Sequence, residues 1–200
     1  MAQRIGRGAR EYPAILLSRL GDHAPEELTA LGNPALLCTR RTALFCSART
    51  PGDAILRAHD AARRLRDEGV TVISGFHSPI EKECLHILLR GKQPIIICPA
   101  RAIETMRIPN ECRAAFDAGR VLFLSPVTTQ PKRVTKESAL RRNEAVAALA
   151  DAAYIAHVFP NGQTEHIAAM LERWGVPMLE DGRGKGKARD QVLPCNTGCA

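Results

Sequence analysis

The stretch VTVISGFHSPIEKECLHILLR, residues 70–90, decides the fold. It opens with a short run of apolar and β-branched side chains, which is typical of a strand buried on both faces of a parallel sheet. A polar turn containing Gly75 follows, and from Ile80 to Arg90 the apolar residues recur at helical spacing. A buried strand, a turn and an amphipathic helix form the repeating unit of α/β proteins. The stretch therefore predicts a strand over Val70–Ser74 and a helix over Ile80–Arg90.

The same unit recurs on both sides of this stretch. The expected strands are Ala43–Cys46, Val70–Ser74, Pro94–Cys98, Val121–Leu124 and Ala153–Val158, with a short sixth run at Val176–Leu179. The expected helices are Asp53–Asp67, Ile80–Arg90, Asn110–Ala118, Glu137–Ala150 and Thr164–Trp174. Such alternation predicts an α/β fold, with a doubly wound, mainly parallel Rossmann-like sheet.

A different pattern precedes these units. A short basic arm is followed by apolar residues at helical spacing over Tyr12–Leu20 and Pro25–Leu31, which predicts a short helical N-terminal preface. After the last helix, glycine combines with positive charge, which predicts a flexible basic tail. We therefore expect three parts: the arm and helical preface over 1–39, the Rossmann-like domain over 40–180 and the basic tail over 181–200.

The charge of the chain indicates an anionic partner. The chain has 28 Lys and Arg against 21 Asp and Glu, a formal net charge of +7 and a sequence pI of about 9.3. Nucleic acid is the partner that such a balance favours. Aromatic residues make up only 4% of the chain, so we expect charge rather than a broad stacking platform to hold the DNA.

We expect a cytoplasmic protein with no membrane partner, no metal and no other cofactor. The seven cysteines are scattered, and four of them lie in or beside apolar runs, a pattern typical of a reducing compartment. Cys195 and Cys199 lack further ligands at a spacing that zinc sites use. No signal segment is recognisable, and no apolar run approaches the roughly 20 residues of a membrane span. Pairing of two subunits into a homodimer through a sheet edge stays open.

The loops after the strands should carry the function, because ligands of open parallel sheets bind beyond the strand carboxyl ends. The turn after Ser74 is the most polar of them, since Ser, His, Glu and Lys side chains crowd around Gly75. The candidates for binding DNA or phosphate are Ser47, Arg49, Ser74, Gly75, Lys82, Lys132, Arg133, Arg141, Arg142, Asn143, Asn161 and Gly162.

Three motifs give the chain a specific resemblance. They are Ser47-Ala48-Arg49 after the first expected strand, the Ser74–Glu81 turn after the second, and Arg142-Asn143-Glu144 before the fifth. Over residues 40–179 the chain resembles the Rossmann-like domain of the DNA-processing protein A family. The resemblance implies the same fold and, since known members bind single-stranded DNA, a DNA-binding role for these turns.

Three positions depart from the family pattern. Glu81 stands where the family has Asp, Pro79 replaces a second Gly, and Glu144 replaces an Arg expected to help bind DNA. A carboxylate beside phosphates weakens DNA binding, so we interpret the departures as a sign of chemistry. Related Rossmann-like folds, the nucleoside deoxyribosyltransferases and the cytokinin-activating phosphoribohydrolases, cleave the bond between base and sugar. A carboxylate stabilises the oxocarbenium-like state of such cleavage.

Our main hypothesis is accordingly a metal-independent DNA N-glycosylase that flips a nucleotide into the pocket and leaves an abasic site, serving in defence against foreign or phage DNA. Its catalytic residues would be Glu81, Glu144 and His77. The alternative is a non-catalytic recombination mediator that binds single-stranded DNA, and a third candidate is a nucleotide N-glycosidase. Simpler roles stay open for the same side chains: Glu81 at a helix dipole, Glu144 in an ion pair with Arg141, and His77 as a structural imidazole.

Overall fold

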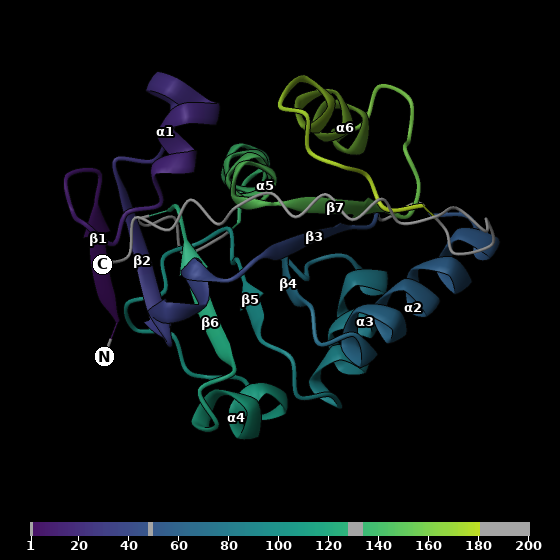
Figure 1. Cartoon of the computed structure of the whole chain (residues 1–200), viewed down its shortest axis with the longest axis horizontal. Helices are drawn as coiled ribbons and strands as arrows, with labels where there is room; N and C mark the ends of the chain where they lie inside the picture. The colour runs from purple at the N-terminus through teal and green to yellow at the C-terminus, as the bar shows by residue number, and fades with distance from the viewer. Residues whose placement is uncertain (1, 48–49, 128–133, 181–200) are drawn as a thin grey trace.

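The computed structural model describes residues 2–47, 50–127 and 134–180 (Figure 1). Its strands are β1 (Gln3–Gly6), β2 (Glu27–Gly32), β3 (Arg41–Phe45), β4 (Thr71–Ser74), β5 (Ile95–Ile97), β6 (Val121–Ser125) and β7 (Ala152–Ile155). Its α-helices are α1 (Ala14–Leu20), α2 (Gly52–Asp67), α3 (Pro79–Leu89), α4 (Asn110–Asp117), α5 (Lys136–Leu149) and α6 (Gln163–Arg173). Two 3₁₀ turns, η1 (Gly21–His23) and η2 (Pro34–Cys38), join the N-terminal elements.

The strands form one sheet in the order β1-β2-β6-β5-β4-β3-β7. All neighbours from β6 to β7 pair in parallel, with Val72 opposite Ile95 and Ala43 opposite Ala153. The predicted doubly wound, mainly parallel sheet is thus confirmed. Most predicted boundaries agree within about two residues, because the buried strands are short apolar runs flanked by polar turns. Strand β7, which ends three residues early, is the exception.

Helices cover both faces of the sheet, with α1, α5 and α6 above it and α2, α3 and α4 below it in Figure 1. Each layer has its own apolar core. One centres on Leu16, Val146 and Leu171, and the other on Leu65, Leu88 and Ile95. Burying each Leu or Ile in these layers stabilises the fold by about 1.5–3 kcal/mol relative to its exposure.

The prediction of a helix over Pro25–Leu31 was wrong, because these residues contain β2. The run of Leu28, Thr29 and Ala30 is buried on both faces and pairs antiparallel with β6, and β1 pairs antiparallel with β2. A short apolar run does not distinguish a buried strand from a helix by periodicity. Gly32 (φ 119°) permits the pairing, since a Cβ there would lie 2.4 Å from the carbonyl oxygen of Val121.

The other predicted N-terminal helix is present as α1, and the expected basic arm contains β1. The sixth run, Val176–Leu179, contributes a single parallel bridge between Met178 and Ala153 and no full strand. Within the described ranges, no helix combines the length and apolar character needed to cross a membrane.

Candidate nucleic-acid interface

The carboxyl ends of β3 and β7 mark the point where the chain changes face. The two strands are parallel neighbours, yet α2 leaves β3 toward one face of the sheet and α6 leaves β7 toward the other (Figure 1). Such a change of face opens a crevice at the strand ends, and ligands of doubly wound sheets bind there. The turns that end β3, β4 and β7 are therefore the places to examine.

Glu81 closes the turn between β4 and α3. Its Oε2 accepts the N–H groups of His77 at 2.8 Å and Ser78 at 3.2 Å, and its Oε1 accepts the N–H of Cys46 at 3.1 Å. The Oγ of Ser78 accepts the N–H of Glu81 in return, which completes a capping box. Glu81 is only 8% exposed, so its carboxylate ties the end of β3 to the start of α3.

The sequence carried a signal for this arrangement. Ser78-Pro79-Ile80-Glu81 has Ser at the cap, Pro at the first helical position and Glu three residues after the cap, which is the capping-box pattern. Pro79, which we interpreted as a departure from a family glycine, begins α3.

Arg142 reaches from α5 to the same turn and is almost completely buried, with 4% exposure. Its Nη1 donates to the carbonyl oxygen of Cys98 at 3.1 Å, and its guanidinium lies against Gly75. Burial lowers the pKa of Arg142, while the nearby carboxylate of Glu81 acts in the opposite direction. Arg142 thus joins the ends of β4 and β5 to α5 from inside the protein, whereas we expected it on the DNA-binding surface.

The backbone of the same turn is strained at Phe76. This residue has a φ of 45° although its ring is buried in the lower core layer. Bulky residues seldom adopt this conformation, and the contacts of Arg142 and Glu81 on either side hold it in place. The Oγ of Ser74 accepts the N–H of Phe76 at 3.3 Å, so the buried Ser74 supports the turn from below.

The remaining α5 candidates make local contacts. Glu144 pairs with His166 of α6 at 3.1 Å, and Asn143 donates to Gln163 at 3.0 Å. Arg141 is exposed and pairs with Glu137 one turn earlier on α5. Glu144 therefore serves the α5–α6 interface, and its pairing partner is not the Arg141 that we had considered.

A second tight turn joins β7 to α6. Asn161 has a φ of 57°, which Asn tolerates well, and its N–H donates to the carboxylate of Glu165. The N–H of Gly162 donates to the carbonyl oxygen of Phe159, and the N–H of Phe159 donates to the Oγ1 of Thr164. Hydrogen bonds thus define this turn, as its Asn-Gly sequence predicts.

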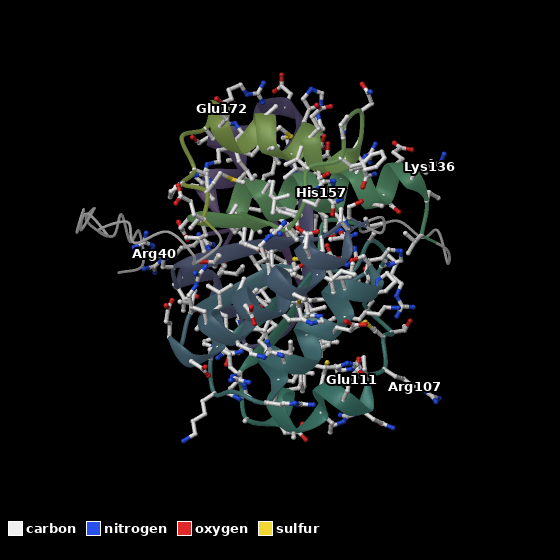
Figure 2. The ribbon with its side chains drawn as sticks, turned by 90° about the vertical axis from the view of Figure 1, so that its right-hand side faces the viewer. Arg40, Arg107, Glu111, Lys136, His157 and Glu172 are labelled. Atoms are coloured by element: carbon white, nitrogen blue, oxygen red, sulfur yellow. The ribbon has the colours of Figure 1, made fainter. Side chains whose placement is uncertain are left out.

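Positive charge collects beside these turns. We name Lys82, Arg101, Arg107 and Lys136 the edge cations: each is exposed and follows the carboxyl end of β4, β5 or β6. Across the described parts of the chain, none of the four side chains has a salt bridge within 4.0 Å. In Figure 2, Lys136 and Arg107 lie along one side of the molecule and Arg40 along the opposite side. The sequence analysis missed Arg101 and Arg107, because both lie in a loop without a recognisable motif.

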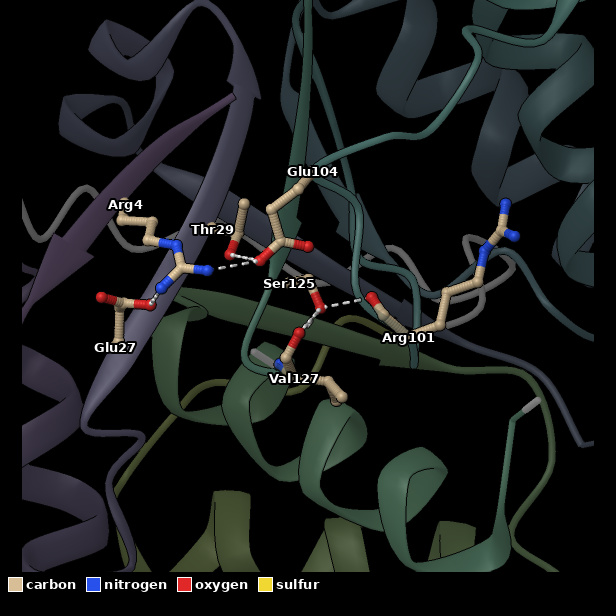
Figure 3. A network of polar contacts seen from close by, with 7 residues as sticks. All are labelled: Arg4, Glu27, Thr29, Arg101, Glu104, Ser125 and Val127. Carbon is tan, nitrogen blue, oxygen red and sulfur yellow. Dashed lines mark hydrogen bonds and ion pairs between the residues drawn. The ribbon is translucent and has the colours of Figure 1, made fainter. Parts of the chain in front are cut away.

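A polar network fixes that loop. The Oγ of Ser125, at the end of β6, donates to the carbonyl oxygen of Arg101 at 2.7 Å, while the Arg101 guanidinium extends away from the network (Figure 3). Glu104 contacts Arg4 of β1 and Thr29 of β2, at 3.5 Å each. The N-terminal strands therefore help to position an edge cation.

Other features lie away from this interface. A hollow of about 320 Å³ between β2 and α4, near Gly32 and Phe116, opens at the opposite edge of the sheet and adjoins none of the predicted site residues. Among residues 2–47, 50–127 and 134–180, no group of three or more His, Cys, Asp or Glu side chains is arranged to hold a metal ion. Arg49, Lys132 and Arg133, which we predicted to bind DNA, lie outside the described residues.

Comparison with known proteins decides the family. The family model of DNA recombination-mediator protein A matches residues 3–162 of this chain. The chain belongs to this family. The match extends the resemblance inferred from the turns into β1 and β2.

Two solved structures of the family have the same fold. DNA processing protein A from Streptococcus pneumoniae superimposes with a TM-score of 0.71 at 19% identity, covering 88% of this chain and 61% of that protein. The protein from Helicobacter pylori, described for its mode of single-stranded DNA binding, gives 0.70 at 20% identity, covering 89% of this chain and 79% of its own. This family member thus spans about three fifths of the Streptococcus protein. No curated protein sequence matches it.

The predicted DNA glycosylase activity is wrong. The family is one of recombination mediators, and nothing in its comparisons supports hydrolysis, base excision or a defence role. The geometry explains the error. Both carboxylate oxygens of Glu81 accept backbone N–H groups, and Glu144 lies between α5 and α6 on the other face of the sheet. The two carboxylates therefore share no cleft, and His77 contributes its backbone N–H to the turn.

Proposed function

We propose that this chain binds single-stranded DNA along the carboxyl edge of its sheet and acts as a non-catalytic recombination mediator. The observation that carries the proposal is the set of edge cations, Lys82, Arg101, Arg107 and Lys136, on loops and helix starts around the crevice. Lys and Arg that neutralise phosphates supply most of the affinity in sequence-independent binding. The net charge of +7 favours the same partner.

The buried groups support this surface without touching DNA. Glu81 and Arg142 hold the ends of β3, β4 and β5 in fixed positions, so that the loops above them present backbone and cations in one geometry. Ser47, Gly75, Asn161 and Gly162 keep their proposed role as close backbone approaches in those turns. A rigid edge lowers the entropic cost of ordering protein groups on the DNA.

We assign DNA binding to residues 40–180, with β1 and β2 from residues 1–39 completing the sheet. The proposed basic tail, residues 181–200, lies outside the described residues. The H. pylori relative, whose structure concerns single-stranded DNA binding, covers 89% of this chain, which is consistent with binding by the part present here.

Fluorescence anisotropy with a labelled oligothymidine strand tests the proposal. A Lys136→Ala/Arg107→Ala variant should bind several-fold more weakly, with a salt slope smaller by about 0.7 per lost phosphate contact. The control is Lys92→Ala/Arg40→Ala, which removes two exposed cations from the strand amino ends. Equal affinities of the two variants would overturn the proposed edge. A released base, detected by mass analysis of the incubated strand, would overturn the non-catalytic role.

A further inference from the structure

One exposed aromatic ring stands on the carboxyl edge. The exposed large apolar side chains of the described residues are Leu17, Leu56, Val134, Val158, Phe159 and Met178, and Phe159 is the only aromatic one. Phe45, Phe76 and Phe123 are buried, and Phe116 packs against Phe123. Phe159 is 39% exposed in a protein that otherwise places its phenylalanines inside.

The backbone under this ring is fixed. The N–H of Phe159 donates to Thr164 Oγ1 at 3.0 Å, and its carbonyl oxygen accepts the N–H of Gly162 at 3.0 Å. The ring also lies close to Gly162, because a Cβ built there would be 3.6 Å from Cδ1 of Phe159. A larger residue at 162 would displace the ring. Phe159 is thus held in one place while part of its surface faces solvent, so little conformational freedom is lost when a flat ligand covers it.

The ring also belongs to the proposed DNA surface. It follows β7 at the strand end where the chain changes face, directly before α6. The first turn of α6 is tied to α5 by the hydrogen bond between Gln163 and Asn143. Lys136, an edge cation, begins α5 about 10 Å before Asn143 along the helix axis. A phosphate backbone at Lys136 therefore runs near the ring.

We propose that Phe159 stacks on a nucleobase of the bound single strand, an inference that rests on the proposed DNA binding. A base is the ligand that fits a lone, fixed, partly exposed ring, since every base offers a flat π-face and such stacking tolerates any sequence. Docking of a protein would call for a larger apolar patch. Only Val158 adjoins Phe159 as an exposed apolar side chain, while Asn161, Gln163 and Glu165 around the turn are polar.

The test separates stacking from phosphate binding with two strands of equal length and charge, oligothymidine and an abasic analogue. Wild-type protein should bind the thymidine strand about fivefold or more tightly than the analogue, since stacking on one base contributes about 1–3 kcal/mol. Phe159→Ala should lose this preference and keep its affinity for the abasic strand, and Phe159→Tyr should retain the preference. Val158→Ala, in the same turn, is the matched control.

The outcomes separate this inference from the proposed function. Salt-dependent wild-type binding to both strands with equal affinity would overturn the stacking role and leave the DNA surface standing. A Phe159→Ala preference equal to that of wild type would also overturn it. Failure of the wild-type protein to bind either strand would overturn both proposals. Unchanged circular dichroism and thermal midpoint of each variant establish that the turn is folded.

Discussion

The guanidinium of Arg142 occupies the space in which a side chain at Gly75 would begin: a Cβ on Gly75 would lie 1.5 Å from Nη1 of Arg142. The Arg is 4% exposed and donates to Cys98, so it cannot move aside without leaving a buried cation and a strand end unpaired. The contact joins the turn after β4 to the strand end of β5 and to α5. It is the point at which two helical layers and the sheet depend on one another.

Gly75→Ala should therefore destabilise the protein by about 1–3 kcal/mol, the usual cost of overpacking a well-packed site. Urea unfolding followed by circular dichroism measures the change. Gly52→Ala is the matched control, because nothing lies within 4 Å of a Cβ at that position. A Gly75→Ala variant as stable as Gly52→Ala would contradict the fixed position of Arg142.

Glu81→Gln should destabilise the protein by about 1–3 kcal/mol, because the new NH₂ group faces backbone donors and leaves them unsatisfied. Urea unfolding measures this change as well. Glu172→Gln, an exposed site on α6, should have no measurable effect. If Glu81→Gln unfolded at the same urea concentration as Glu172→Gln, the structural role of this carboxylate would be wrong.

Arg19→Ala should loosen α1 from α5 and α6. Nη1 of Arg19 donates to the carbonyl oxygens of Ala148 and Ala150 at the end of α5, and the guanidinium lies 5.8 Å from the ring centre of Trp174. We expect a loss of about 1–3 kcal/mol and a shifted emission of Trp174, the single tryptophan. Arg173→Ala removes a similar ring contact without those hydrogen bonds and should cost less. Equal costs would reject the capping role of Arg19.

Stability should fall as the pH rises above about 8.5, the ordinary pKa of a thiol. Burial raises the pKa of Cys98 to about 12 and that of Cys112 to about 11. Between pH 8.5 and 11 the unfolded thiols lose protons that the folded ones keep, so each thiol lowers the free energy of unfolding by about 1.4 kcal/mol per pH unit. Urea titrations at pH 8 and 9.5 measure this, and a Cys98→Ala variant should show a smaller decline. An unchanged decline would contradict the burial of that thiol.

The parallel part of the fold could be predicted because β3 to β7 are apolar runs joined by amphipathic helices, a pattern that few architectures produce. Strand β2 could not, since Leu28 and Ala30 gain their strand conformation from pairing with β6 far along the chain. The site was predicted at the correct edge, but the roles of its residues were not. Sequence places Arg141 and Arg142 side by side, and only packing buries one while the other stays in solvent. Glu81 could have been recognised from its capping box.

The order of the strands also constrains how the chain acquires its shape during synthesis. β1 and β2 can pair with each other as soon as residue 32 has been made, but β2 pairs next with β6, where Thr29 lies opposite Ser125. β3 likewise gains its outer neighbour only when β7 has been made. Both margins of the sheet therefore wait for distant parts of the chain, and contacts of this kind slow folding. A ribosome that has released only the first half of this protein holds a pair of strands whose place in the sheet does not yet exist.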